Sequence, residues 1–366
     1  MSAKPEALSS IPPPAWRREA RIVGTPVASA GVIAAAVEGG VAAFDPATGS
    51  PLWTNSEARG EPAVRSTLLS YGDMLQFNNG TGEVFMLDPA TGRTVHAARQ
   101  VGFGTYQSDL LPEGGILYFA AGTSVYALGP GFEVLRERAL IGTGDLAASR
   151  DGILGLAMDA ETLFIEHFRG MTALDKSDFT VRWTWDAGQD VYFGNGRRRP
   201  ALFGAWVILA GERLSAQPTG RFFFLDRQSG AAGEEFAPPG GLGNFSPLVL
   251  GDTLLHGYEL SLLDLNTMQL RWSVDTGDTR REPVPDGPFV YVASRLGYIY
   301  RLEAASGAVR QEVELSWVYG GPLPDLRRPS EFRSGLLLDS GHFYFGAKDA
   351  ETGIVSLYKV PAGGAA

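Results

Sequence analysis

Histidines are the side chains of this sequence best suited to bind a metal or move a proton, and their spacing favours neither role. The 366 residues include four histidines. These are His96, His167, His256 and His342. No HxH or HExxH motif places two of them on one element, as a zinc site would require. We therefore interpret each histidine as structural and predict no metal ligand.

Nucleophile and phosphate-binding motifs are missing as well. The chain contains no cysteine, which excludes a disulfide, a thiolate nucleophile and a thiolate metal site. It has no Gly-x-Ser-x-Gly elbow and no Walker loop, and residues 102–104 (GFG) lack the rest of a dinucleotide fingerprint. We expect no catalytic residue and no bound cofactor, and we expect that the protein is not an enzyme.

Aspartates recur at regular intervals within a longer repeated phrase. The fullest copy, residues 40–53, reads GVAAFDPATGSPLW, and the second, residues 84–96, reads VFMLDPATGRTVH. The aspartates in register are Asp45, Asp88, Asp175, Asp226 and Asp264. An aspartate can accept hydrogen bonds from the backbone of its own turn, and the following glycine can adopt a positive φ. We interpret the aspartates as turn residues between two strands.

The repeat length predicts the fold class. Successive copies lie roughly 45 residues apart, which suits a four-stranded propeller blade. We predict an all-β chain that forms a single closed β-propeller of about eight four-stranded blades, with seven as the alternative. The expected blades are residues 22–54, 62–98, 106–138, 145–185, 200–236, 245–274, 283–314, and 332–360 joined to 14–20.

The two ends of the chain are expected to form one blade together. The last copy, residues 356–360, stops before its fourth strand, and Trp16 has no blade before it. Pairing of the N-terminal strand with the last copy would leave no exposed sheet edge. We expect residues 1–13 to be disordered, residues 14–361 to form the propeller domain, and residues 362–366 to be a flexible tail.

Prolines and tryptophans mark further positions of the repeat. Proline fits the first position of a strand, where no backbone donor is lost. The prolines expected before each innermost strand are Pro26, Pro62, Pro200, Pro247 and Pro283. Trp53, Trp183 and Trp272 are expected to pack between blades, with His96 in the corresponding place of the second copy.

Residues 43–53 resemble the PQQ-like repeat of quinoprotein dehydrogenases and of the outer-membrane assembly lipoprotein BamB, and weaker copies cover nearly the whole chain. The resemblance implies the propeller fold, which hosts oxidoreductases, scaffolds and ligand binders. The dehydrogenases carry a vicinal cysteine pair over their cofactor, and this chain has no cysteine. In addition, no Asp-x-Asp or Glu…Asn arrangement in the sequence stands out as a Ca²⁺ site. BamB is exported and acylated on a cysteine, and neither a signal nor a cysteine is found here.

The charge balance limits the expected partners. The formal net charge is −10 and the sequence pI is near 5.0, which argues against nucleic acid or anionic lipid as the main partner. Residues 1–14 lack the apolar region of a secretory signal. We expect a monomeric cytoplasmic protein that binds neither nucleic acid nor membrane.

The connectors between blades are rich in arginine, asparagine and aromatic residues, which makes them the candidate binding face. Its residues are Arg65, Tyr106, Asn195, Arg197, Arg198, Arg199, Phe245, Arg280, Arg281, Trp317, Tyr319, Arg328 and Arg333. Arginine forks match carboxylates, and aromatic rings supply rigid contact area. The alternative interpretation is that these arginines pair with nearby acidic residues, as Arg328 could with Asp325 or Glu331.

These observations lead to two hypotheses about function. The first is a protein-binding scaffold of PQQ-repeat type that works either in assembly or as a cytoplasmic immunity protein that neutralises its partner. The second is a small-ligand binder or quinone-dependent oxidoreductase that uses the central funnel. The second hypothesis predicts a pocket lined by Arg65, Asn195 and Arg280.

Overall fold

The computed structural model describes residues 14–58, 67–79, 83–98, 110–121, 123–140, 152–193, 199–214, 219–238, 241–243, 245–277, 279, 281–294, 298–314, 334–348 and 354–362. In these ranges the regular elements are β-strands, with no helix, and they form eight sheets. The predicted all-β fold is confirmed: the sheets are the eight blades of a β-propeller. Within the same ranges, no helix is long and apolar enough to cross a membrane.

Four sheets come from the first part of the chain. The first contains β2 (Val27–Ser29), β3 (Val32–Val37), β4 (Gly40–Phe44) and β5 (Pro51–Asn55). The second contains β6 (Thr67–Tyr71), β7 (Met74–Asn78), β8 (Val84–Leu87) and β9 (Thr94–Ala98). The third contains β10 (Leu111–Glu113), β11 (Ile116–Ala121), β12 (Ser124–Leu128) and β13 (Val134–Ala139). The fourth contains β14 (Ile153–Met158), β15 (Thr162–His167), β16 (Gly170–Asp175) and β17 (Val181–Asp186).

The remaining four sheets come from the second part. The fifth contains β18 (Val191–Tyr192), β19 (Ala201–Phe203), β20 (Trp206–Arg213), β21 (Thr219–Asp226) and β22 (Ala232–Phe236). The sixth contains β23 (Leu248–Leu250), β24 (Thr253–His256), β25 (Leu260–Asp264) and β26 (Gln269–Val274). The seventh contains β27 (Val284–Asp286), β28 (Phe289–Ala293), β29 (Tyr298–Glu303) and β30 (Val309–Glu314). The eighth contains β31 (Leu337–Asp339), β32 (His342–Lys348), β33 (Val355–Pro361) and β1 (Trp16–Glu19).

Contacts divide the chain into two compact units. One comprises Met1–Asn79, Phe85–Val95 and Thr276–Ala366, and the other comprises Gly80–Val84 and His96–Asp275. The first unit contains the first, seventh and eighth sheets. The second unit contains the third, fourth, fifth and sixth sheets.

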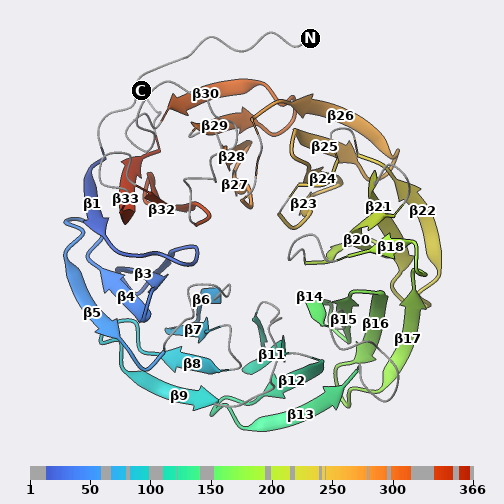
Figure 1. Cartoon of the computed structure of the whole chain (residues 1–366), viewed down its shortest axis with the longest axis horizontal. Coiled ribbons are helices and arrows are strands. Elements are labelled where there is room, and N and C mark those ends of the chain that lie inside the picture. The colour runs from blue at the N-terminus through green and yellow to red at the C-terminus, as the bar shows by residue number, and fades with distance from the viewer. Residues whose placement is uncertain are drawn as a thin grey trace. The chain divides into compact units, whose positions relative to one another are not determined.

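Each sheet is an antiparallel meander, and Figure 1 shows the strands of a sheet, such as β27 to β30, side by side in chain order. Antiparallel order places the turn between strands two and three at the same end of the sheet as the connectors to neighbouring sheets. We call this the connector end. The turns between strands one and two and between strands three and four lie at the opposite end, which we call the turn end.

The N-terminal strand completes the eighth sheet, as predicted. Strand β1 pairs with β33 in antiparallel register, from Trp16 opposite Lys359 to Glu19 opposite Ser356. The eighth sheet therefore takes three strands from the C-terminal part of the chain and its fourth from the N-terminal part.

The fifth sheet differs from the four-stranded prediction. Strands β20 and β21 are eight residues long, and β19 pairs with one part of β20 only, from Ala201 opposite Ile208 to Phe203 opposite Trp206. Strand β18 pairs with the rest of that edge, at Glu212 and Arg213. The connector thus supplies hydrogen-bond partners that the short first strand does not reach.

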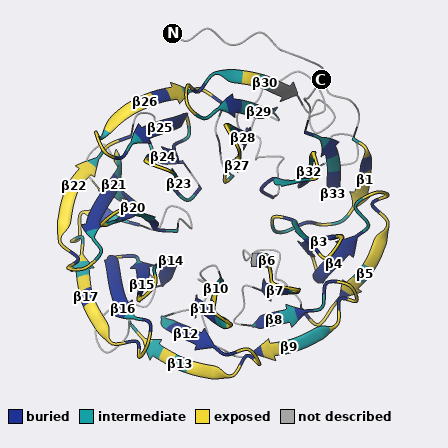
Figure 2. Cartoon of the chain, turned by 180° about the vertical axis from the view of Figure 1, so that it is seen from behind, coloured by how far each residue is buried: buried dark blue, intermediate teal, exposed yellow. Residues whose placement is uncertain are grey.

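Burial separates the middle strands from the fourth strand of each sheet, as the dark blue and yellow ribbons of Figure 2 show. Strands β3 and β4 are buried at every residue, whereas β13 and β22 are exposed or intermediate throughout. A strand covered on both faces favours a continuous apolar run over alternation, and β3 reads VIAAAV.

Proline positions agree with the predicted strand starts. Pro26, Pro200, Pro247 and Pro283 each directly precede the first strand of a meander, namely β2, β19, β23 and β27. Pro62 lies outside the described residues.

Candidate binding site

The repeated aspartates are turn residues, as predicted. Asp45 Oδ1 accepts hydrogen bonds from the backbone N–H of Ala47 (2.9 Å) and Thr48 (2.8 Å). Asp88, Asp175, Asp226 and Asp264 accept equivalent bonds. Hydrogen bonds to the ionised form lower the pKa of all five carboxyls.

Tryptophan rings lie on the turn glycines. Gly92 has a φ of 71°, and an ideal Cβ there would lie 2.3 Å from Trp53 Cε3. Trp53 Nε1 donates a 2.8 Å hydrogen bond to the carbonyl of Pro89. Trp183 makes the same pair of contacts with Gly230 and with the carbonyl of Arg227 (2.9 Å).

The prediction that Trp53 and Trp183 pack between blades is thereby confirmed. Trp272 is also buried, with 9% of its surface exposed. His96, in the tryptophan position of the second copy, lies with its ring centroid 6.2 Å from that of Phe132.

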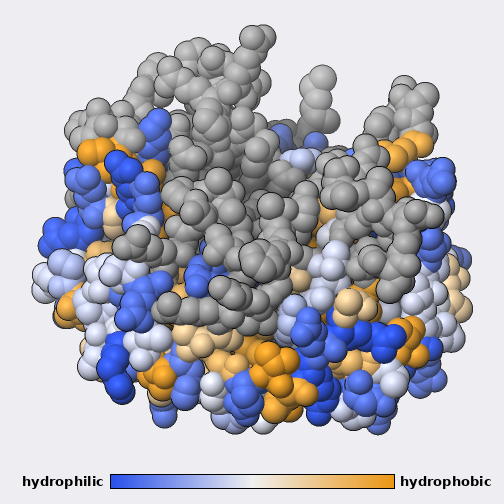
Figure 3. Space-filling view, turned by 60° about the horizontal axis from the view of Figure 1, so that its bottom comes forward, coloured by the Kyte–Doolittle hydropathy of each residue, from blue (hydrophilic) through white to orange (hydrophobic). Residues whose placement is uncertain are grey.

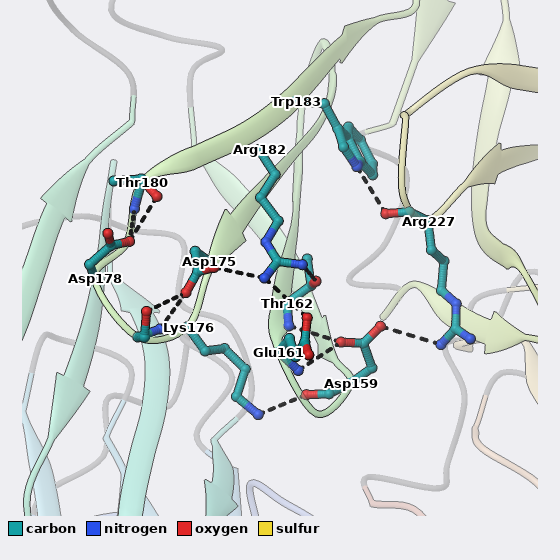
Figure 4. A network of polar contacts seen from close by, with 11 residues as sticks. Asp159, Glu161, Thr162, Asp175, Lys176, Asp178, Thr180, Arg182, Trp183 and Arg227 are labelled. Carbon is teal, nitrogen blue, oxygen red and sulfur yellow. Dashed lines mark hydrogen bonds and ion pairs between the residues drawn. The ribbon is translucent and has the colours of Figure 1, made fainter.

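Charged side chains at the turn end of the fourth sheet bind one another, as Figure 4 shows. Arg182 donates to Asp175 Oδ2 (2.7 Å) and to Thr162 Oγ1 (2.9 Å). Lys176 Nζ, which is almost fully buried, donates to the carbonyl of Asp159 (2.7 Å) and to Glu113. This cluster stabilises two neighbouring turns and leaves these groups engaged within the chain.

The junction between the third and fourth sheets is built without a tryptophan. Arg136 of β13 lies opposite Ala127 of β12, just as Trp53 of β5 lies opposite Ala43 of β4. Arg136 therefore occupies the tryptophan position of the third copy. The glycine position of the next turn is held by Phe179, with a φ of 62°. Arg138 Nη1 donates a 2.8 Å hydrogen bond to the Phe179 carbonyl. This junction therefore has polar, charged side chains where the junctions of Trp53 and Trp183 have an indole ring.

A pocket of about 260 Å³ lies at this junction. Its polar lining is Arg138 of β13, His167, Arg169 and Thr172 of the β15–β16 hairpin, and Thr184 and Asp186 of β17. Leu140, Phe168 and Val181 contribute apolar surface. Since Leu140 follows β13, Arg169 lies between the second and third strands, and Asp186 ends β17, most of the lining is at the connector end.

His167 is a neutral hydrogen-bonding group of the pocket. Burial lowers its pKa to about 4. Its Nε2 lies 3.3 Å from Thr172 Oγ1, which is 3.3 Å from Thr184 Oγ1. At neutral pH this chain of groups can donate and accept hydrogen bonds without adding charge.

The charged groups of the pocket are two guanidiniums and one carboxylate. Arg169 Nη2 lies 3.6 Å from Asp186 Oδ2, with 44% and 55% of the side chains exposed. Apart from its bond to Phe179, Arg138 makes no further hydrogen bond with any part of the chain that the structure describes. The pocket is therefore positively charged on a chain of net charge −10.

Three residues of the predicted binding face are described. The Arg199 backbone N–H donates to Ser246 Oγ (2.9 Å), and the side chains of Arg199 and Arg281 are half-buried. Phe245 is 4% exposed, so its ring has little surface to offer a partner. The others lie outside the described residues: Arg65, Tyr106, Asn195, Arg197, Arg198, Arg280, Trp317, Tyr319, Arg328 and Arg333.

The pocket residues are absent from the predicted binding face because they lie outside the connectors between blades. Arg138 lies on a strand, and His167 and Arg169 lie beside the turn between the second and third strands. One signal was present in the sequence. The third copy has no tryptophan at the position where the first and fourth copies have Trp53 and Trp183.

Comparison with known proteins supports the repeat type. The family model of the outer membrane protein assembly factor BamB matches residues 14–110. Among curated proteins, none is similar enough in sequence to match the chain.

Several solved structures share the fold. BamB from Moraxella catarrhalis is 14% identical with a TM-score of 0.62, over 95% of this chain and 99% of that one. The quinohemoprotein alcohol dehydrogenase from Comamonas testosteroni is 13% identical with a TM-score of 0.68, over 97% of this chain and 77% of that one. The computationally designed Ika8 protein is 13% identical with a TM-score of 0.68, over 94% and 98%. At these identities the likeness concerns the fold alone.

The dehydrogenases that the repeat resembles carry a vicinal cysteine pair over their quinone. The chain has no cysteine, and the described residues contain no group of three or more His, Asp or Glu side chains arranged to hold a metal ion. The fold and the repeat are nevertheless shared. By its eight sheets and these matches, the chain is an eight-bladed β-propeller whose residues 14–110 are similar to the outer membrane protein assembly factor BamB family.

Proposed function

We propose that this chain is a protein-binding scaffold without chemistry of its own, and that its partner binds at the connector end of the sheets. The observation that carries the proposal is a difference between the two ends of the fourth sheet. At the turn end, Arg182 and Lys176 are engaged with acidic and carbonyl groups of the chain. At the connector end, Arg138 and Arg169 line an accessible pocket.

The pocket is better suited to binding than to catalysis. His167 and Thr172 are within reach of each other, as a base and a nucleophile would be. However, a pKa of about 4 makes the His167 imidazole a weak base near neutral pH. Thr172 is buried, with 6% of its surface exposed, and its hydroxyl also contacts Thr184. With no strong base beside it, this hydroxyl is better suited to donate a hydrogen bond to a ligand than to attack one.

Scattered apolar residues fit the same proposal. Figure 3 shows orange hydrophobic residues interspersed with blue hydrophilic ones over the described surface in view. The exposed large hydrophobic side chains include Leu52, Val134 and Val181, on the fourth strands of different sheets. Val134 and Leu135 of β13 are neighbours, and the remaining ones come from other segments, a distribution that is ordinary for a protein surface. They favour recognition through polar groups over a broad hydrophobic interface.

The match to an assembly factor favours a role in assembly. A cytoplasmic protein that neutralises its partner, as an immunity protein does, is the alternative form of the same proposal. In both forms the partner is another protein and the propeller is monomeric.

The test is quantitative capture of partners by the tagged chain in its source cells, after crosslinking. Three baits are compared: the unchanged chain, an Arg138→Gln/Arg169→Gln variant, and an Arg182→Gln/Arg271→Gln control at the turn end. We expect a stoichiometric protein partner whose recovery falls at least tenfold with the first variant only. The proposal would be contradicted if no protein were enriched, or if both variants reduced the recovery of the partner equally.

A second measurement addresses chemistry. The purified chain is mixed with PQQ and Ca²⁺ and assayed for dye reduction with alcohols and sugars. We expect neither a stoichiometric visible absorbance nor turnover. If dye reduction depended on added PQQ, the chain would be an oxidoreductase and the proposal of a non-enzymatic scaffold would be wrong.

A further inference from the structure

The pocket between the third and fourth sheets lies at one of the junctions where the repeat has no tryptophan. At the junctions of Trp53 and Trp183 the indole ring covers the next turn glycine and caps a turn carbonyl. At this junction Phe179 replaces the glycine and packs near Tyr118, with ring centroids 6.4 Å apart. The tryptophan position is Arg136. The junction therefore combines an apolar inner wall with a polar, open outer part.

Two arginines of β13 point into this junction. Alternate residues of a strand share a face, so Arg136 lies on the same face as Arg138. One nitrogen of Arg136, Nη1, is buried and has no hydrogen-bond partner among the described residues. Glu137, between them, lies on the other face and contacts the hydroxyl of Tyr126 (3.1 Å). The strand therefore adds positive charge to the junction without an acidic residue on the same face.

The opposite wall of the pocket holds a weak ion pair. Arg169 and Asp186 are 3.6 Å apart and about half exposed, and pairs of this kind contribute little to stability. An incoming anion can therefore contact Arg169 at small cost. Asp186 remains nearby and repels a second negative charge, which favours a singly charged group over a phosphate dianion.

We infer that this pocket binds a carboxylate, held by the guanidiniums of Arg138 and Arg169 and by the hydroxyl and imidazole groups beside them. Planar guanidinium forks match the two oxygens of a carboxylate. Leu140 and Phe168 offer apolar surface to the carbon atoms that carry it. The inference rests on the proposed function in one respect: the carboxylate is taken to be an acidic side chain or the C-terminus of the protein partner.

The test uses the full chain labelled with ¹⁵N-arginine and observes the Nε–H signals of Arg138 and Arg169. The free-acid probe is propionate, with propionamide as its neutral control. The peptide probe is N-acetyl-Ala-Glu-Ala-amide, with the Gln peptide as control. We expect both carboxylates to shift these signals saturably in the millimolar range, and neither amide to do so.

Variants separate binding from folding. Arg169→Gln removes a side chain whose one ionic partner among the described residues is Asp186, so we expect it to fold and to weaken binding of the Glu peptide at least fivefold. Asp186→Asn keeps the Oδ1 that accepts the Gly188 N–H and should strengthen binding. Arg310→Gln, which breaks a surface pair with Glu303, is the control and should leave binding unchanged.

Each outcome has a defined meaning. Equal shifts with acids and amides, or full binding by Arg169→Gln, would overturn the inference. Binding of propionate without binding of the Glu peptide would support a carboxylate site and contradict its assignment to an acidic side chain of the partner. Capture of a protein partner without any carboxylate response would overturn the carboxylate site and leave the proposed function standing.

Discussion

The indole ring of Trp16 lies against Gly49, and Trp16 Nε1 donates a 3.1 Å hydrogen bond to the carbonyl of Pro46. Arg18 Nε adds a 2.9 Å bond to the carbonyl of Gly49. Trp53 and Asn55 make equivalent contacts with the turn of the second copy: Trp53 donates to the Pro89 carbonyl, and Asn55 donates to the Gly92 carbonyl. The N-terminal strand is thus bound twice, by its ladder to β33 and by a tryptophan–glycine contact with the first repeat.

Replacement of Trp16 should therefore cost as much as replacement of a core residue. Trp16 is 7% exposed, and removal of a buried tryptophan side chain lowers the free energy of unfolding by about 3 to 5 kcal/mol. We expect this loss for Trp16→Ala in urea unfolding followed by circular dichroism. Arg17→Ala on the exposed side of the same strand is the control. A loss below about 1 kcal/mol for Trp16→Ala would show that β1 contributes little to the fold.

Turn glycines should differ according to whether a tryptophan covers them. Gly92 and Gly72 both have positive φ, 71° and 58°, but a Cβ at Gly72 would meet no atom within 4 Å. Gly72→Ala should cost about 1 to 2 kcal/mol through backbone strain alone. Gly92→Ala should cost about 1 to 3 kcal/mol more because its Cβ would collide with Trp53. The melting temperatures of the two variants test this, and equal losses would contradict the packing role of Gly92.

His256 should make stability sensitive to mild acid. It is 2% exposed, its ring lies 4.9 Å from that of Phe222, and neither ring nitrogen has a hydrogen-bond partner in the described part of the chain. Burial lowers its pKa to about 3. Between that value and the ordinary pKa of about 6.5, the unfolded state binds a proton that the folded state does not, so stability falls as the pH falls.

The expected loss from His256 is roughly 2 kcal/mol between pH 6.5 and pH 5. His167, whose pKa is also lowered by burial, contributes with the same sign. We expect His256→Leu to flatten the dependence of the free energy of unfolding on pH in this range without abolishing it. Denaturant titrations at several pH values provide the measurement. If His256→Leu left the pH dependence of the free energy of unfolding unchanged, His256 would have to accept a proton in the folded state.

One surface turn offers a stabilising substitution. Ala30 and Gly31 join β2 to β3, with φ values of 47° and 79°. Two-residue hairpin turns with both φ positive favour Asn-Gly, and alanine is strained in this region. Ala30→Asn should raise the free energy of unfolding by about 0.5 to 1 kcal/mol, whereas Ala30→Val should lower it. If Ala30→Asn were destabilising, the turn would have another conformation.

Local patterns in the sequence determined the strands and the turns and indicated about eight blades, and the structure decided between eight and seven. An Asp-x-x-Thr-Gly turn forms its hydrogen bonds within a few residues, so each copy specifies its own hairpin wherever it occurs. The unpaired last copy and Trp16 were enough to predict that the N-terminal strand completes the eighth sheet, because an open sheet edge is unfavourable.

Tertiary structure alone decided which positions face a pocket. Phe179 and Met268 occupy the turn position that glycine holds in the first copy, with φ values of 62° and 56°. No rule of local propensity predicts a bulky residue there, because packing compensates for the strain. Arg138, Arg169 and Asp186 come from three separate segments, and their meeting depends on how two sheets pack. The repeat therefore determined the scaffold, while the packing of the third sheet against the fourth, at a junction without tryptophan, located the candidate site.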